Sequence, residues 1–471
     1  MRARPLAPAL RLAASALLLE ASSLVGVPSV HAAELGPFPK APEITRLDNG
    51  LTVVTIPWAS PGIVAYYTLV RVGARDEVEP GHSGFAHLFE HMMFRGTERF
   101  PEQVYEDTLQ SFGADSNAYT TEDFTLYTIT APRSALARVA ELEGDRFQHL
   151  SFDERQYRTE TGAVLGEYNK SASSPSLKMW EALSELAFKS HTYRHTTIGY
   201  LADVQAMPNE YAYAKAFFKR FYTPDNATVV VAGEVPHAEN VALVKQHYGG
   251  WRGTRDQPTV PAEPEPTQGA RRHLDWDGMS APELLIGYRA SAFAGPGQGK
   301  LDAARVRDAA ALDVVRALLF HPAAPLYQAL VVERQQLLAL DSYAKSWTRD
   351  PGLFVVNAEL KDDGPGFEAI EREIQQAIDA LARGEVNADR VAAVRSHLRY
   401  GLTLDVETAS EAADTFAQFV AVSGSTDALE AYLGALGAVT AEDVARVAAR
   451  YLTPQRRFVI TLKAKPRGGT P

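Results

Sequence analysis

The 471-residue sequence has no cysteine, no lysine- and arginine-rich run and, after residue 33, no uninterrupted apolar segment approaching about 18 residues. Without cysteine the protein forms no disulfides, and a metal would have to be held by nitrogen and oxygen ligands. The formal net charge of −11 argues against a nucleic-acid partner. Because every later apolar run is short, we expect no membrane span.

The first 33 residues differ from the rest of the chain. MRARPLAPALR carries three arginines and no acid, LAASALLL is apolar, and SVHAAE offers small residues for cleavage after Ala32 or Ala33. This order predicts a signal peptide over residues 1–33 and export, to the periplasm if the source is a Gram-negative bacterium. The alternative is a frayed N-terminus of a cytosolic protein.

Residues 254–270, TRDQPTVPAEPEPTQGA, contain four prolines and few apolar side chains, which predicts an extended linker. The linker would separate an N-terminal half, 34–253, from a C-terminal half, 271–471. RFYTPDNATVVVAG in the first half is echoed about 230 residues later by RYLTPQRRFVITLK, and FEHMMF is echoed at a similar distance by VRALLF. These echoes indicate a duplicated architecture.

Strand and helix patterns do not alternate regularly, which predicts an α+β fold rather than a doubly wound parallel sheet. ITRLDNGLTVVTI predicts a β-hairpin around Asn49-Gly50. Residues 63–73 and 124–131 have the pattern of strands. Residues 132–150 have the pattern of a helix with proline in its first turn.

GFAHLFEHMMFRGT, residues 84–97, places His87, Glu90 and His91 on one predicted helix. On an α-helix these side chains project within an arc of roughly 100°. Two imidazoles one turn apart can bind one zinc ion, and the carboxylate beside them can accept a proton from a zinc-activated water. The alternative is an ordinary helix face with two surface histidines. The matching positions of the second half carry no such residues, so any zinc chemistry belongs to the first half.

A third ligand is expected from ERQYRTETGAVLGEYNK, where Glu160 and Glu167 lie nearly two helical turns apart on one face. One would bind the metal and the other would support a ligating histidine, and the spacing does not decide which. The alternative is a solvated helix face. His191 and His195 form another i,i+4 pair, but no acid accompanies them, so we interpret them as loop and wall residues.

Together, GFAHLFEHMMFRGT, NAYTTEDFTLY, ETGAVLGEYNK and FYTPDNATVVVAG resemble the pitrilysin-type zinc peptidases with an inverted H-x-x-E-H motif, the inverzincins of family M16. The shorter members, such as the mitochondrial processing peptidase subunits and their bacterial counterparts, are the most similar. The likeness runs from about residue 44 to residue 465. It implies two homologous halves, each a mixed, mainly antiparallel sheet packed with helices, that form a clam-like chamber.

The resemblance also implies the roles of individual residues. One zinc ion per chain would be held by His87, His91 and Glu167. Glu90 would be the general base, and Glu160 the supporting carboxylate. The family's peptide substrates add a strand to the segment that matches Asn117 and Ala118, although from the residues alone Asn117 has the pattern of a turn residue.

The C-terminal half departs from the family pattern. Members that act alone resemble LFQELREKRGLAYSV there, and the first Arg and the Tyr of that run contact the substrate and the developing oxyanion. In LYQALVVERQQLLAL, Val331 and Leu338 occupy those two positions. Arg334 matches the family's other arginine, and Tyr343 comes five residues too late. We therefore expect a second M16-like subunit, or a second copy of this chain, to supply the missing pair.

The leading hypothesis is a zinc-dependent metalloendopeptidase that hydrolyses peptides or small unfolded polypeptides by Glu90-assisted attack of a zinc-bound water. The alternative is a zinc-binding, peptide-binding or assembly subunit with weak or no catalysis of its own. A zinc hydrolase for a non-peptide substrate ranks third. The retained Glu90 favours the first hypothesis, because a structural zinc site needs no general base.

Overall fold

Six strands of the N-terminal half form one sheet in the order β1-β2-β6-β3-β5-β4. The pairs are antiparallel except β2 with β6, which is parallel. The predicted hairpin is present, and its Gly50 has a φ of +95°, a conformation that favours glycine. The strands are β1 (Glu43–Arg46), β2 (Thr52–Pro57), β3 (Ile63–Val70), β4 (Asp115–Thr120), β5 (Thr125–Pro132) and β6 (Ala227–Gly233).

This computed structural model describes residues 38, 40–293, 300–344, 347–362, 364 and 366–465. The expected signal peptide, residues 1–33, lies outside the described residues. The helices of the first half are α1 (Phe85–Met92), α2 (Glu102–Ser111), α3 (Leu136–His149), α4 (Glu154–Ala172), α5 (Pro175–Ala187), α6 (Leu201–Ala206), α7 (Tyr211–Phe221) and α8 (His237–Tyr248). The predicted helix within residues 84–97 corresponds to α1, and the helix predicted at 132–150 corresponds to α3. Helix α3 begins only at Leu136, because Pro132 is the last residue of β5 and not part of the first helical turn.

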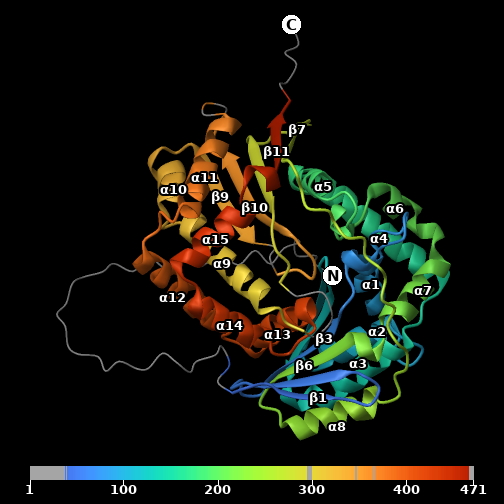
Figure 1. Cartoon of the computed structure of the whole chain (residues 1–471). Coiled ribbons are helices and arrows are strands. Elements are labelled where there is room, and N and C mark those ends of the chain that lie inside the picture. The colour runs from blue at the N-terminus through green and yellow to red at the C-terminus, as the bar shows by residue number, and fades with distance from the viewer. Residues whose placement is uncertain are drawn as a thin grey trace, which may run out of the picture. The chain divides into compact units, whose positions relative to one another are not determined.

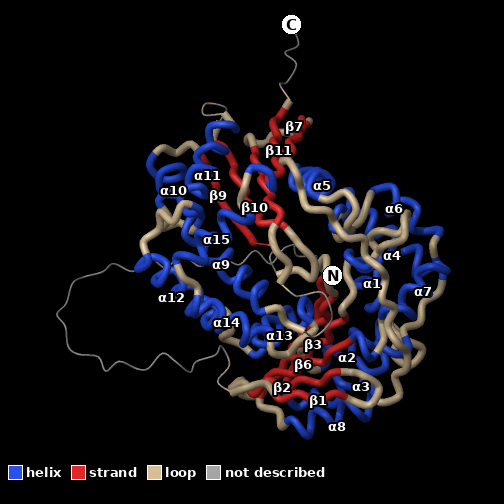
Figure 2. Tube along the Cα trace, viewed as in Figure 1, coloured by secondary structure: helices blue, strands red, loops and turns tan. Residues whose placement is uncertain are grey.

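The C-terminal half repeats this plan. Its sheet has the order β7-β11-β8-β10-β9, and only β7 with β11 is parallel. Taken in chain order, these five strands occupy the places of β2 to β6. The strands are β7 (Ala270–Trp276), β8 (Glu283–Arg289), β9 (Leu337–Ala344), β10 (Leu353–Leu360) and β11 (Arg457–Ala464). Figure 2 shows the strands of each half gathered with helices around them, and the expected α+β fold of two homologous halves is confirmed.

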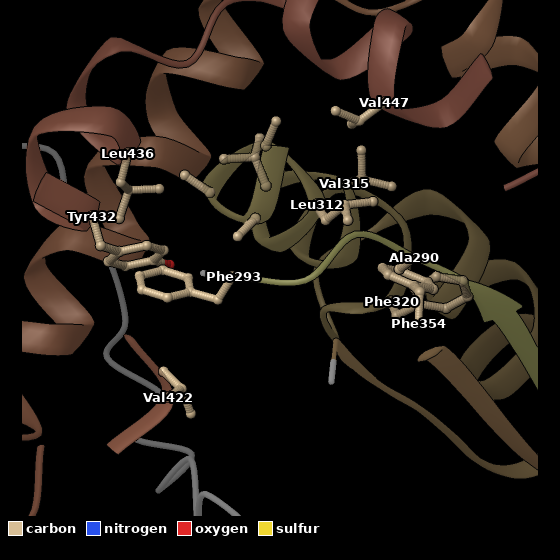
Figure 3. Close-up of a cluster of buried hydrophobic side chains, with 14 of the residues drawn as sticks. Ala290, Phe293, Leu312, Val315, Phe320, Phe354, Val422, Tyr432, Leu436 and Val447 are labelled. Atoms are coloured by element: carbon tan, nitrogen blue, oxygen red, sulfur yellow. The ribbon is translucent and has the colours of Figure 1, made fainter. Parts of the chain in front are cut away.

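Helices of the second half enclose a large apolar core. Figure 3 shows Leu312 and Val315 of α9 near Val447, with the ring of Phe293 beside that of Tyr432. The helices are α9 (Ala303–Phe320), α10 (Pro325–Tyr327), α11 (Phe367–Ala382), α12 (Ala388–Leu404), α13 (Ala409–Ser423), α14 (Ala428–Ala438) and α15 (Ala441–Tyr451), with a π-helix at Gln328–Glu333.

The segment that begins with α9 bears on the expectation of no membrane span. Within the described part of the chain, Ala303–Glu333 is the one helical segment that length and composition alone would allow to cross a membrane. Of its apolar window, 67% is buried inside the protein. A buried core helix passes the same test, so the segment is only a weak indication of a span.

One helix from each half packs on the sheet of the other half (Figure 1). Helix α5 packs on β7, β8 and β11, and its Leu183 joins one apolar cluster with Val355 and Ile460 of the second sheet. Helix α13 of the second half packs on β3 and β6 of the first sheet. The Tyr119 hydroxyl of β4 donates a 2.8 Å hydrogen bond to Asp414 of α13. The two halves therefore share apolar cores, which the sequence did not indicate.

Residues 347–350 of the second half add polar links to the first half. Arg349 Nη1 lies 3.1 Å from Asp76 Oδ2. Asp350 Oδ2 lies 2.5 Å from Arg75 Nε and 3.2 Å from His191 Nε2. Partial burial alone would raise the pKa of Asp350, but His191 and Arg75 outweigh it and hold that pKa below its ordinary value of 3.8. Asp350 therefore stabilises the contact between halves as a charged group.

The proline-rich segment forms neither helix nor strand from residue 251 to residue 269. It is nevertheless fixed, because the Glu263 carboxylate accepts hydrogen bonds of 2.7 to 3.0 Å from the backbone N–H groups of residues 189–191. The Arg289 guanidinium of the second half lies 3.8 Å from the same carboxylate. The domain boundaries at 253 and 271, and the chamber between the halves, stay predictions.

Candidate metal centre

Helix α1 begins at a glycine and is capped by a distant carboxylate. Gly84 has a φ of +92°, and a Cβ there would lie 2.6 Å from the carbonyl oxygen of Ile198, so only glycine fits. The buried Glu77 carboxylate accepts hydrogen bonds from the N–H groups of Gly84 at 2.8 Å and Ala86 at 2.7 Å. Burial raises the pKa of Glu77 to about 8. These contacts fix the end of α1 that precedes the H-x-x-E-H residues.

Helix α4 lies against α1 and begins with a capping box. The Asp153 side chain accepts a 2.7 Å hydrogen bond from Gln156 N–H, and the Gln156 side chain accepts one of 2.9 Å from Asp153 N–H. Residues of α4 that share the buried face include Tyr157, Glu160 and Val164. The same face carries Glu160 and Glu167 toward α1, as the seven-residue spacing predicts.

One oxygen of Glu167 lies between the two histidines of α1. Glu167 Oε2 is 3.5 Å from Nε2 of His87 and 3.5 Å from Nε2 of His91. One ligand atom from each residue can be chosen so that all three lie within 4.8 Å of one another. In a tetrahedral zinc site, ligand bonds of about 2.0–2.1 Å place neighbouring donor atoms about 3.4 Å apart. The separations of the Glu167 oxygen from the two histidine nitrogens therefore suit a single zinc ion.

Electrostatics at these three residues also suit a metal. Burial lowers the pKa of His87 and so favours the neutral imidazole. His91 lowers the pKa of Glu167, which favours the carboxylate. Burial works against charge on His91 as well, but the Glu160 and Glu167 carboxylates outweigh it and raise its pKa to about 9. A metal ion entering this site would displace a proton from His91.

Glu160 contacts the other nitrogen of His91. Its Oε2 lies 3.5 Å from His91 Nδ1, the ring atom that does not face Glu167. Glu160 is 3% exposed, and its Oε1 pairs with the guanidinium of Arg95. His87 differs, because its Nδ1 is buried without a hydrogen-bond partner within the described part of the chain. The structure thus brings Glu160 and Glu167 to opposite sides of one imidazole.

Glu90 is only partly buried, and Thr120 of β4 contacts it. The Thr120 hydroxyl donates a 2.7 Å hydrogen bond to Glu90 Oε2. Sequence reasoning missed both Thr120 and Arg95. Arg95 follows His91 by four residues, a helical spacing, and Thr120 lies two residues after Ala118 on the same strand face, so both positions carried a local signal.

Asn117 and Ala118 lie in β4, the last strand of the sheet, which pairs only with β5 in the described structure. Asn117 is exposed, and its carbonyl accepts a 3.2 Å hydrogen bond from the Thr128 hydroxyl. The alternative interpretation of Asn117 as a turn residue is wrong, because the residue is paired with Thr128 in regular sheet register. One edge of β4 is thus left without a strand partner among the described residues.

The second histidine pair does not join a metal group. His191 and His195 are 4% and 7% exposed and flank a short 3₁₀ turn. Of the residues described, His87, His91 and Glu167 form the only group of three with suitable ligand atoms.

Two residues, Val331 and Leu338, occupy the sequence positions of the family's Arg and Tyr. They lie on the π-helix and on β9, respectively. Val331 packs partly buried against the core, and Leu338 is 54% exposed. Arg334 pairs with Glu373 at 2.5 Å, and the Tyr343 ring stacks on Trp180. Neither Arg334 nor Tyr343 occupies the position of the absent Arg/Tyr pair in the sequence.

Two family models match this chain. The family model described as "Insulinase (Peptidase family M16)" matches residues 59–200, the part that holds the candidate site. The model described as "Peptidase M16 inactive domain" matches residues 210–398, which hold none of the candidate site residues. Together the two matches span more than two thirds of the chain.

Individual proteins are similar over most of their length. Zinc protease PqqE of Helicobacter pylori is 26% identical over 456 residues, 93% of this chain and 98% of that protein. A probable mitochondrial-processing peptidase subunit beta of Arabidopsis thaliana is 24% identical over 88% of this chain and 77% of its own. The crystal structure of a protease from Helicobacter pylori matches with a TM-score of 0.81 at 25% identity, over 90% of this chain and 99% of that chain.

The two family-model matches and the shared fold of two homologous halves define the class of this protein. The chain belongs to peptidase family M16.

Proposed function

We propose that this chain is a zinc-dependent metalloendopeptidase with one zinc ion held by His87, His91 and Glu167. The position of Glu167 Oε2, 3.5 Å from the Nε2 atoms of both histidines, carries the proposal. The similarity to a protein named as a zinc protease supports it. When bound, zinc would lower the pKa of a water molecule and polarise a substrate carbonyl.

The chain's own residues would transfer the proton and hold the catalytic groups in position. Glu90, next to His91 on α1, would take the proton of the attacking water and pass it to the leaving amine. Thr120 would hold the Glu90 carboxylate in place through its 2.7 Å hydrogen bond. Glu160 would orient the His91 ring by its contact with Nδ1.

The free edge of β4 would bind the substrate. An extended peptide can pair its main chain with Asn117 and Ala118, because an edge strand presents unpaired N–H and C=O groups. Thr120 lies on the same strand and touches Glu90. A peptide bound in this way would run past the general base, which suits peptides or small unfolded polypeptides as substrates.

A second candidate is a zinc-binding, peptide-binding or assembly subunit with weak or no catalysis of its own. Val331 and Leu338 favour it, because the oxyanion of the transition state needs a fixed donor and the loss of one costs about 3 kcal/mol. A second M16-like subunit, or a second copy of this chain, would then supply the Arg/Tyr pair. The similarity to a protein named as a subunit supports a partner. Full peptidase activity of the chain alone would contradict the need for a partner subunit.

The deciding experiment is hydrolysis of a quenched-fluorescent peptide library by the purified chain, with added zinc and with a chelator control. We expect chelator-sensitive cleavage that Glu90→Gln abolishes while one zinc stays bound per chain. Cleavage that Glu90→Gln leaves unchanged would refute Glu90 as the base. Zinc binding without cleavage by the wild-type chain would favour the subunit, and mixing with a partner would then restore the activity.

Export to the periplasm is part of the proposal and depends on residues 1–33. Mass spectrometry of the mature chain from cells should find an N-terminus after Ala32 or Ala33. A chain that retains Met1 would contradict export.

A further inference from the structure

Arg95 connects the candidate metal centre to the next helix. It lies in the 3₁₀ turn after α1, and Gly96 follows it with a φ of +82°. A Cβ on Gly96 would lie 2.5 Å from the carbonyl oxygen of Phe100, so the chain can turn there only with glycine. Beside this turn, the Arg95 side chain reaches Glu160 of α4 and Glu102 of α2.

The Arg95 guanidinium binds two carboxylates at once. Its Nη2 pairs with Glu160 Oε1, and its Nη1 lies 2.7 Å from each oxygen of Glu102. The two partners differ in exposure, since the side chain of Glu160 is 4% exposed and that of Glu102 is 36% exposed. Arg95 and Glu102 also line a surface cavity of about 540 Å³. The Glu160 carboxylate is therefore largely shielded from water, and the Glu102 carboxylate is not.

The buried Glu160 carboxylate depends on Arg95 for its pairing and its orientation. A buried carboxylate is costly unless it is paired and hydrogen-bonded. Within the described structure, the ion pairs of Glu160 are with Arg95 and His91. A metal-binding imidazole is neutral, so Arg95 would then be the only full positive charge paired with Glu160.

We propose that Arg95 is a positioning residue for the metal site: it fixes Glu160 against His91 Nδ1 and thereby presents His91 Nε2 toward His87 and Glu167. This inference rests on the proposed zinc site and extends it by one residue. The chain of contacts runs from Arg95 through Glu160 to His91 and ends at the atom that faces Glu167. Removing Arg95 frees the Glu160 carboxylate to rotate, and the His91 ring loses its orienting partner.

The test measures zinc affinity directly, by competition with a chromophoric chelator. We expect Arg95→Met to lose about tenfold to a hundredfold in affinity, the usual effect of removing a residue that orients a ligand. Arg95→Lys should lose less zinc affinity than Arg95→Met, because an ammonium keeps the positive charge but does not reproduce the planar geometry of the guanidinium against Glu160. The cobalt-substituted Arg95→Met protein should also show shifted visible absorption bands, which a remote structural defect would not produce.

Two controls separate this role from a simple tether between α1 and α2. Glu102→Gln removes the outer partner and leaves the Arg95–Glu160 pair, so zinc affinity should stay close to that of the wild type. Arg99→Gln removes a nearby exposed ion pair with Glu141 and should also leave affinity unchanged. Glu160→Gln combined with Arg95→Met should lose no more affinity than the stronger single variant, because both act through one contact.

Circular dichroism identifies any variant that does not fold, and Arg95→Lys then replaces Arg95→Met. Wild-type zinc affinity in both Arg95 variants, or an equal loss in Arg99→Gln, would overturn the positioning role. If the wild-type chain itself bound no zinc, the proposed function would fail and this inference with it.

Discussion

The hydroxyl of Thr120 donates a 2.7 Å hydrogen bond to Oε2 of Glu90, and so joins the edge strand β4 to the H-x-x-E-H helix. The two residues are 30 positions apart in the chain. Because β4 is the strand that would bind the substrate, this bond connects peptide binding to the position of the general base. It gives a specific expectation about catalysis.

Thr120→Val should lower kcat by about tenfold to a hundredfold and leave KM and bound zinc nearly unchanged. Hydrogen bonds to a charged group contribute ~1.5–3 kcal/mol, and here the loss falls on the base rather than on substrate binding. Thr120→Ser keeps the hydroxyl and serves as the matched control. Steady-state kinetics with one peptide checks both variants, and an equal loss in Thr120→Ser would contradict the role of the hydroxyl.

Glu167→Gln should abolish the stabilisation that zinc gives to the chain. Zinc at a hundred times its Kd stabilises a folded protein by ~2.7 kcal/mol, and this appears as a rise in Tm on zinc addition. The variant lacks the anionic oxygen between the two histidines, so its Tm should not respond. Glu154→Gln is the control, because Glu154 lies on the same helix in an exposed pair with Arg158. A full zinc response in Glu167→Gln would show that another residue provides the third ligand.

Asp350→Asn should weaken the contact between the halves in a pH-dependent way. The folded-state pKa of Asp350 lies below its ordinary value of 3.8, so its contribution is present above that value and is lost as the pH falls below it. We expect the variant to be less stable than the wild type by about 2 kcal/mol at neutral pH, and the two stabilities to converge as the pH falls below that value.

Urea unfolding of the metal-free chain measures this difference without interference from zinc release. Asp256→Asn removes a more exposed aspartate, paired with Arg220, and should cost much less. A stability difference that does not shrink in acid would mean that Asp350 acts through shape rather than charge.

Cleavage of the linker should leave the two halves together. A protease site inserted at the exposed Thr259 allows the chain to be cut after folding. Because α5 and α13 each pack on the sheet of the other half, the cut protein should elute as a single species in gel filtration and keep its zinc. The uncut insertion protein is the control. Leu183→Ala weakens the shared core by ~2–5 kcal/mol and should make the cut form separate more readily. Prompt separation of the wild-type halves would refute shared cores as the main link.

Local patterns predicted the elements well. The Asn49-Gly50 turn, helices α1 and α4 and the strands at β3 and β5 all follow from periodicity and turn residues close together in the chain. The duplicated halves could also be predicted, because Thr-Pro breaks and strand ends recur at a fixed distance. Asn117 was harder to place, because an asparagine after Gly-Ala-Asp-Ser suits a turn, and only pairing with β5 puts it in a strand.

The sequence by itself determined the chemistry of the candidate site: which residues can bind a metal, that no cysteine competes with them, and that Glu90 stands beside them. Helical spacing fixed these properties, because residues three or four positions apart share one face of a helix in any fold. Only the tertiary structure decided that Glu167 Oε2 lies between both histidines while Glu160 lies behind His91 against Arg95. Tertiary packing likewise made α5 and α13 cross between the halves, since the distance and angle between two helices depend on every side chain between them.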